Sequence, residues 1–297
     1  MDGGPPTART LTFLTPDGHR GSCFVILLSA FKISPQANKP TSSSPYMPLI
    51  APGDLIVDSW INFRRNLATY VEVVIWFALL GVVRWAIASF SRAFVGDVSF
   101  RYLLTLLMNL PVLFIYGILT IALTDLVGAH LDKRKMDVRT ALNNGIHKIF
   151  SAIWVSIITG AGIALGFIFF VIPAFILTIR WRFAQDFLIL DGIKGVSAVK
   201  ASSKIVSGRW WITLGRVLAP AIFFYAGAAF VTSIAYLLFG AMLGDPGLFF
   251  GQYSAGQVLP KTHEIITAIV PQITSGFALP LYIGAELLLW ADLKKTA

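Results

Sequence analysis

The chain has 297 residues, of which 56% are hydrophobic and only 13% are charged. Soluble globular domains carry about 25% charged residues, so this composition excludes a soluble enzyme as the default class. The formal net charge is +9, but the Lys and Arg residues stand in short stretches between apolar segments, where they report membrane topology rather than a nucleic-acid ligand.

Residues 1–50 are rich in Gly, Pro and Ser. Such a segment buries too little apolar surface to offset the entropy lost on ordering, so we predict a flexible N-terminal tail over 1–50. The single cysteine, Cys23, excludes a disulfide framework. Residues 51–297 are predicted to form an all-α, polytopic membrane domain, which is a six-helix transmembrane bundle with short cytoplasmic interfacial helices.

A bilayer-spanning helix needs about 20 predominantly apolar residues, and six such stretches follow one another along the chain. They cover about 67–90, 102–129, 149–170, 173–190, 211–243 and 265–290. The fourth follows the third almost without a loop and carries several charges, so we expect the two to insert together as a hairpin. The fifth is longer than the bilayer requires, so it should tilt or begin in the interface.

The charges of the loops predict the orientation of the spans. Basic residues gather on one side, at Arg64, Arg65, Lys133, Arg134, Lys135, Arg139, Lys148, Lys194, Lys200, Lys204, Arg209, Lys294 and Lys295. The opposite side has only Arg92, Arg101 and Lys261. Because positive loops mark the cytoplasmic side, we predict a multi-pass protein of the cell inner membrane with both termini in the cytoplasm.

A short, basic, amphipathic stretch precedes the first, third and fifth spans, at 58–66, 141–150 and 199–211. Aromatic residues stand where each stretch enters the membrane, as is typical of an interfacial helix. One interpretation is a threefold repeat of an interfacial helix and a transmembrane hairpin. The other is that any cytoplasmic loop is polar and basic for topological reasons alone.

Seven ionisable side chains fall inside the predicted spans toward their cytoplasmic ends. They form a candidate intramembrane charged cluster of Glu72, Asp125, Arg180, Arg182, Asp186, Arg216 and Glu286. A charge at mid-bilayer costs about 2.5–3.5 kcal/mol on insertion scales, so each group should pair, reach the headgroups or face a hydrated cavity. Arg182 and Asp186 are four residues apart and can pair on one helix face. Structural pairing is one interpretation of the cluster, and a substrate or ion site is the other.

Three glycines in the third span, Gly160, Gly162 and Gly166, indicate close packing against another helix. Small residues let two helix backbones approach within a membrane. The glycines therefore bear on assembly rather than on chemistry.

The segment 166–210 is similar to a recurrent bacterial pattern. In that pattern an apolar run ends in Ile-Pro-Gly, and an Arg-aromatic pair, an acidic-Gly turn, an Ala-x-x-x-Ser stretch and a basic-aromatic helix entry follow. The matching residues are Pro173, Arg180, Trp181, Asp191, Gly192, Ala198, Ser202 or Ser203, Gly208, Arg209 and Trp210, with Ala174 in place of the usual Gly.

This pattern resembles the membrane domain that is fused to some bacterial glycerophosphoryl diester phosphodiesterases and that also occurs in stand-alone integral membrane proteins. The resemblance covers about 55–295. It implies a six-helix membrane domain and implies no established catalytic residue.

The sequence offers no catalytic, metal-binding or cofactor-binding constellation. His130, His147 and His263 are isolated from Cys and from one another, unlike metal ligands, and neither a nucleophile elbow nor a phosphate-binding loop motif is present. We therefore predict no enzyme activity, no cofactor and no nucleic-acid partner. The predicted partners are anionic lipid headgroups at the basic cytoplasmic face, with proteins as a second class.

The predicted function is a non-catalytic membrane scaffold, or a lipid- or partner-associated domain. The alternative is a small transporter or channel-like protein whose path is lined by the seven charged residues. A transporter should gather these charges around a hydrated cavity, whereas a scaffold should point them at headgroups or hold them in direct pairs.

Overall fold

The computed structural model describes residues 49–94, 96–244, 247–250 and 260–296. Within these ranges the regular structure is entirely helical, which confirms the all-α class. The flexible tail predicted over 1–50 lies outside the described residues except for Leu49 and Ile50. Both of these residues contact the helical domain through hydrogen bonds.

Within the described ranges, five helices are long and apolar enough to cross a membrane. They are α3 (Leu67–Phe94), α4 (Val98–Leu131), α5 (Val138–Phe169), α9 (Trp210–Leu243) and α11 (Lys261–Lys295). The shorter helices are α2 (Pro52–Arg65), α6 (Val171–Arg180), α7 (Ala184–Asp191), α8 (Gly195–Val206) and α10 (Gly247–Phe250). The chain is therefore a multi-pass membrane protein.

The predicted count of six spans is not confirmed, because the stretch 173–190 is divided. Helix α6 ends at Arg180, residues 181–183 form a turn, and α7 begins at Ala184. At 1.5 Å per residue, the ten residues of α6 rise about 15 Å, roughly half of a hydrocarbon core of about 30 Å. Neither short helix spans a bilayer alone.

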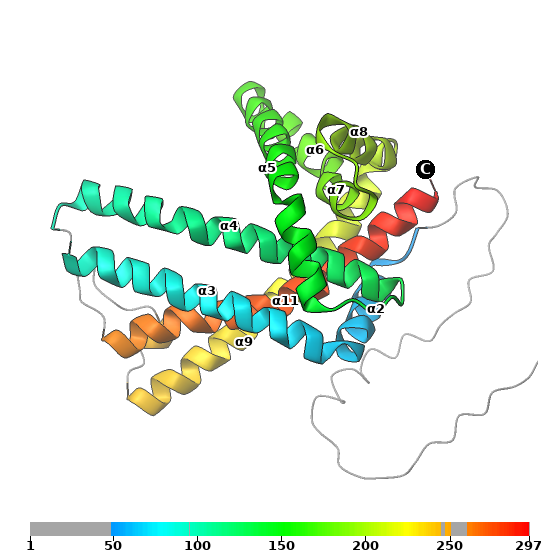
Figure 1. The fold of residues 1–297 in the computed structure, drawn as a ribbon. Coiled ribbons are helices and arrows are strands. Elements are labelled where there is room, and N and C mark those ends of the chain that lie inside the picture. Colours follow the sequence, from blue (N-terminus) through cyan, green and yellow to red (C-terminus); the bar gives the residue numbers. More distant parts are fainter. Residues whose placement is uncertain (1–48, 95, 245–246, 251–259, 297) are drawn as a thin grey trace, which may run out of the picture. The chain divides into compact units, whose positions relative to one another are not determined.

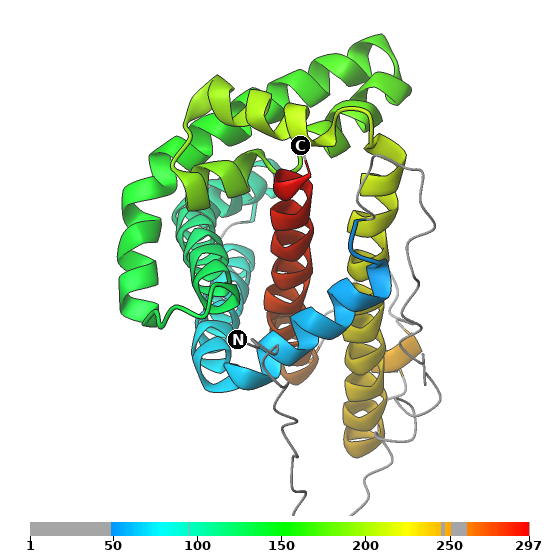
Figure 2. The same cartoon turned by 90° about the vertical axis from the view of Figure 1, so that its right-hand side faces the viewer.

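Helix α11 is the centre of the domain and packs against α3, α4 and α9 (Figure 1). The C-terminal half of α11 is buried among these neighbours, with Leu287, Leu289 and Leu293 at most 2% exposed. Helix α2 crosses α11 and reaches α9 (Figure 2). The two helices approach closely at this crossing, because a Cβ on Gly284 would lie 2.6 Å from Ser59 Oγ and would displace that hydroxyl.

Helix α5 packs against α4 along its first part only. Gly145 lies against the carbonyl oxygen of Ile118, and the ring centroid of Phe150 lies 6.0 Å from that of Phe114. Beyond Phe150, α5 instead contacts α6, α7 and α8. Figure 1 shows this part of α5 running across the direction of α3 and α4.

The three amphipathic stretches differ in the structure. Helix α2 contains most of the first stretch and α8 contains the first part of the third, so both are separate short helices. The second stretch, 141–150, belongs to the continuous helix α5. The second predicted unit therefore has no separate short helix in the structure.

Candidate functional site

One buried hydroxyl fixes the turn between α6 and α7. Ser202 of α8 is fully buried; its Oγ donates to the carbonyl oxygen of Arg180 at 2.9 Å and accepts from the Phe183 N–H at 3.1 Å. Where a helix stops, backbone groups lose their helical partners, and Ser202 replaces two of them. Ser202 is one of the two serines that the sequence pattern allowed.

This turn directs Arg182 toward α11. Arg182 Nη2 lies 2.8 Å from Glu286 Oε2 and donates to the Tyr282 hydroxyl at 2.8 Å. The guanidinium also lies 5.5 Å from the centroid of the Tyr282 ring, within cation–π range. The Glu286 side chain is 8% exposed and the Arg182 side chain 38%, so the buried carboxylate has a cation that still reaches the surface of the protein.

Asp186 lies beside this pair without joining it. Its Oδ2 is buried and has no hydrogen-bond partner among the described residues, and the ion pair that Arg182 forms is with Glu286 rather than Asp186. Asp186 belongs to α7, outside the five candidate spans. Burial raises the pKa of its carboxyl group, the Glu286 carboxylate raises it further, and Arg182 opposes the rise. One guanidinium thus faces two carboxyl groups, which favours a protonated Asp186.

Asp125 has partners on a different helix. It accepts a hydrogen bond from Asn144 Nδ2 at 2.7 Å and lies 3.5 Å from Lys148 Nζ. The same ammonium group donates to the carbonyl oxygen of Ile189 at 2.8 Å. This contact set joins α4, α5 and α7 near the basic loops.

Arg216 binds backbone carbonyls instead of a carboxylate. Its guanidinium donates to the carbonyl oxygens of Ile50 at 2.6 Å and Leu49 at 3.0 Å. The N–H of Ile50 in turn donates to Asp292 at 2.8 Å. The segment before α2 is thereby fastened to α9 and α11.

The remaining two members of the predicted cluster, Glu72 and Arg180, are exposed. The seven residues therefore do not form one site. The structure brings together three of them, Arg182, Asp186 and Glu286, and adds Tyr282, which the sequence analysis did not single out. A tyrosine one helical turn before a charged residue on a predicted span is the signal that was available.

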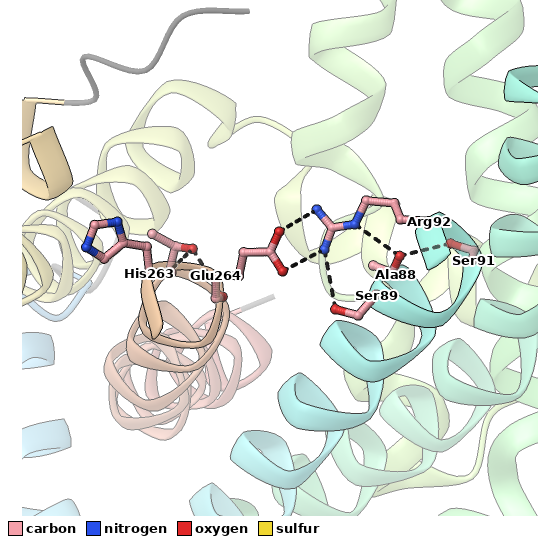
Figure 3. A network of polar contacts seen from close by, with 7 residues as sticks. Ala88, Ser89, Ser91, Arg92, His263 and Glu264 are labelled. Carbon is pink, nitrogen blue, oxygen red and sulfur yellow. Dashed lines mark hydrogen bonds and ion pairs between the residues drawn. The ribbon is translucent and has the colours of Figure 1, made fainter. Parts of the chain in front are cut away.

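Further polar contacts at both ends of the bundle were not predicted. At the end opposite the basic loops, both oxygens of Glu264 lie 3.0 Å from the guanidinium nitrogens of Arg92 (Figure 3). At the basic end, Asp191 accepts from Lys294 at 2.7 Å. Both pairs join residues distant in sequence, so spacing along the chain gives no sign of them.

A small cavity lies between α3, α4, α9 and α11. Its volume is about 60 Å³ and its polar lining comes from Tyr116, Tyr225, Gln272 and Ser275, so it has room for a few water molecules. None of the seven predicted charges lines it. Within the described residues, no group of three His, Cys, Asp or Glu side chains is placed to hold a metal ion.

Comparisons with protein-family models, with curated proteins and with solved structures found no match. The resemblance to the phosphodiesterase-associated membrane domain therefore stays a prediction.

Proposed function

We propose that this protein is a non-catalytic membrane scaffold, or a lipid- or partner-associated domain, of the type suggested by the pattern at 166–210. The observation that carries the proposal is that the intramembrane charges bind other groups of the same chain. Arg182 pairs with Glu286, Asp125 with Lys148, and Arg216 with backbone carbonyls. Each contact joins two segments of the fold, which is the arrangement expected of charges that serve assembly.

Both termini are proposed to face the cytoplasm, in the inner membrane. Two contacts support a common side for the basic loops and the C-terminus: Asp191 accepts from Lys294, and Arg209 donates to the Thr296 carbonyl oxygen at 2.7 Å. The positive charge gathered at this end is suited to anionic headgroups, with about 1 kcal/mol for each Lys or Arg near the surface.

The second candidate is a proton- or cation-conducting transporter. It is favoured by the Asp186 Oδ2, which has no hydrogen-bond partner in the described part of the chain, and by the polar cavity, whose Tyr225 ring centroid lies 5.7 Å from that of Tyr282. A path through these groups would depend on the Asp186 carboxyl.

Reconstitution into vesicles with an entrapped pH-sensitive dye separates the two functions. The scaffold predicts no proton flux above that of protein-free vesicles under an imposed potential, and no change in flux on Asp186→Asn. It also predicts that anionic lipid raises the thermal midpoint and that salt reduces this effect, because surface charges are screened. A flux that Asp186→Asn abolishes, and that the exposed loop variant Asp132→Asn retains, would overturn the proposal.

A further inference from the structure

We propose that α5 from Phe150 onward, together with α6, forms an apolar arm (residues 150–180) that is embedded in the cytoplasmic leaflet without crossing the membrane. Its partner is the acyl-chain region of that leaflet. The inference rests on the proposed function in two respects, namely that the long helices of the bundle are inserted in a bilayer and that their basic end faces the cytoplasm.

Contacts with α9 and α11 fix the position of α6 along the bundle. Trp210, the first residue of α9, donates to the carbonyl oxygen of Ile176 at 3.2 Å and packs its ring against Phe175. The adjacent Arg209 bonds to Thr296 at the end of α11. The middle of α6 therefore lies at the cytoplasmic end of both long helices.

The tip of the arm is only a short distance from the middle of α6. Phe170, the residue that links α5 to α6, lies six positions before Ile176, and at 1.5 Å per residue this segment rises about 9 Å. A hydrocarbon core is about 30 Å thick. The tip therefore cannot reach the opposite surface, even though α5 alone is long and apolar enough to cross.

The exposed residues of the tip identify lipid as the partner. The six consecutive residues of the tip, 167–172, are all apolar and each is at least 58% exposed. Residues 167–169 end α5 and residues 171–172 begin α6. Because successive residues of a helix are rotated by about 100°, these exposed side chains stand on several faces of the tip. A protein partner covers one face, whereas acyl chains surround a segment on all sides.

Contacts between the base of the arm and the bundle fix the depth at which the arm leaves the bundle. Lys148, just before the arm, bonds to Asp125 of α4 and to the carbonyl oxygen of Ile189 in α7. Gly162 and Gly166 let α6 pack directly on α5, against Trp181 and Ala174. At its base, the ring of Phe150 lies 6.0 Å from that of Phe114, near the middle of α4. The arm is thus a helical hairpin that leaves the bundle beside the middle of α4 and returns through α6 to the cytoplasmic end.

Depth measurements by fluorescence quenching test the arm in the full chain. With Cys23→Ser as background, a dye is placed on exposed positions of the arm and, as matched controls, on exposed positions of α3. The arm positions are Ile157→Cys, Leu165→Cys and Ile168→Cys, and the α3 positions are Leu67→Cys, Leu79→Cys and Phe90→Cys. Each labelled protein is reconstituted with lipids that carry a nitroxide either near the headgroup or near the acyl-chain end.

The arm predicts that the shallow nitroxide quenches more strongly than the deep one at all three arm positions. Along α3, the shallow nitroxide should quench more strongly at Leu67→Cys and Phe90→Cys, and the deep nitroxide more strongly at Leu79→Cys, because that helix crosses the membrane. An α3-like profile along the arm would overturn the proposal in favour of a crossing hairpin, and protection of the arm from both quenchers would overturn it in favour of a protein partner. If α3 itself lacks the crossing profile, membrane insertion of the bundle is what fails.

Discussion

Arg182 stands between two buried carboxyl groups, and this position defines what can replace it. Glu286 contacts the guanidinium directly, whereas Asp186 lies nearby with an unpartnered oxygen. Removing the cation leaves the Glu286 carboxylate without a compensating charge in a region of low dielectric, beside the carboxyl group of Asp186. Arg180, two residues earlier and exposed, offers the same side chain without this environment.

We expect Arg182→Met to destabilise the domain substantially. Loss of one partner of a buried ion pair costs about 3–5 kcal/mol, and the lower end applies because the Arg182 side chain is 38% exposed. Arg180→Met should change the free energy of unfolding by less than about 0.5 kcal/mol, as surface substitutions usually do. Unfolding in detergent by denaturant titration measures both variants. Equal stability of the two would show that the Glu286 pair contributes nothing to the fold.

The sequence predicted that each intramembrane charge needs a partner. It did not predict which group that partner is. The spacing of Arg182 and Asp186 predicted a pair within one helix, yet the turn at 181–183 separates the two residues and turns Arg182 toward Glu286, 104 positions away. Asp125 and Arg216 likewise find partners in other segments. Such partners depend on tertiary packing, which local periodicity does not encode.

Among the elements, the sites of close helix approach determine how α5 leaves the bundle. A Cβ on Gly145 would lie 2.8 Å from the carbonyl oxygen of Ile118 on α4, a contact that backbone cannot avoid without moving. A Cβ on Gly160 would meet no atom within 4 Å. The sequence pattern predicted packing at Gly160 and gave no sign of Gly145, because spacing within a helix does not show which face meets a neighbour.

Gly145→Ala should therefore separate α4 from α5, whereas Gly160→Ala should not. Overpacking of this kind costs about 1–3 kcal/mol, while Gly to Ala in an open helix position is neutral or stabilises by up to about 1 kcal/mol. The thermal midpoint of each purified variant in detergent checks the difference. A lowered midpoint for Gly160→Ala, with none for Gly145→Ala, would contradict the packing of α5 on α4.

The long helices were predictable because each is a run of about 20 or more apolar residues, and hydropathy reports such runs directly. Hydropathy does not report the direction in which a helix runs relative to its neighbours. The third predicted span is a continuous helix, but its second half leaves α4 and meets α6, and the fourth is interrupted at 181–183. Both differences arise from contacts at Gly162, Gly166 and Ser202 with residues elsewhere in the fold.

For the whole molecule, the contacts at one end of the bundle limit the possible topologies. The α7–α8 connection lies near the end of α4 and near the C-terminus, because Leu190 lies against Gly128 and Lys294 pairs with Asp191. The loop at 132–137 directly follows α4. The turn between α3 and α4 lies at the other end of those helices. Hence the chain crosses the membrane an even number of times between residues 135 and 194, whether zero times or twice.

This parity predicts the labelling of single cysteines by a membrane-impermeant maleimide in intact cells, with Cys23→Ser as background. Gly96→Cys, in the exposed turn after α3, should react from outside. Lys135→Cys and Lys194→Cys, both exposed, should react only after the membrane is permeabilised, because positive loops are retained in the cytoplasm. Reaction of Lys194→Cys, but not Lys135→Cys, in intact cells would mean a single crossing between them. That result would contradict both the common side of the basic loops and the hairpin formed by α5 and α6.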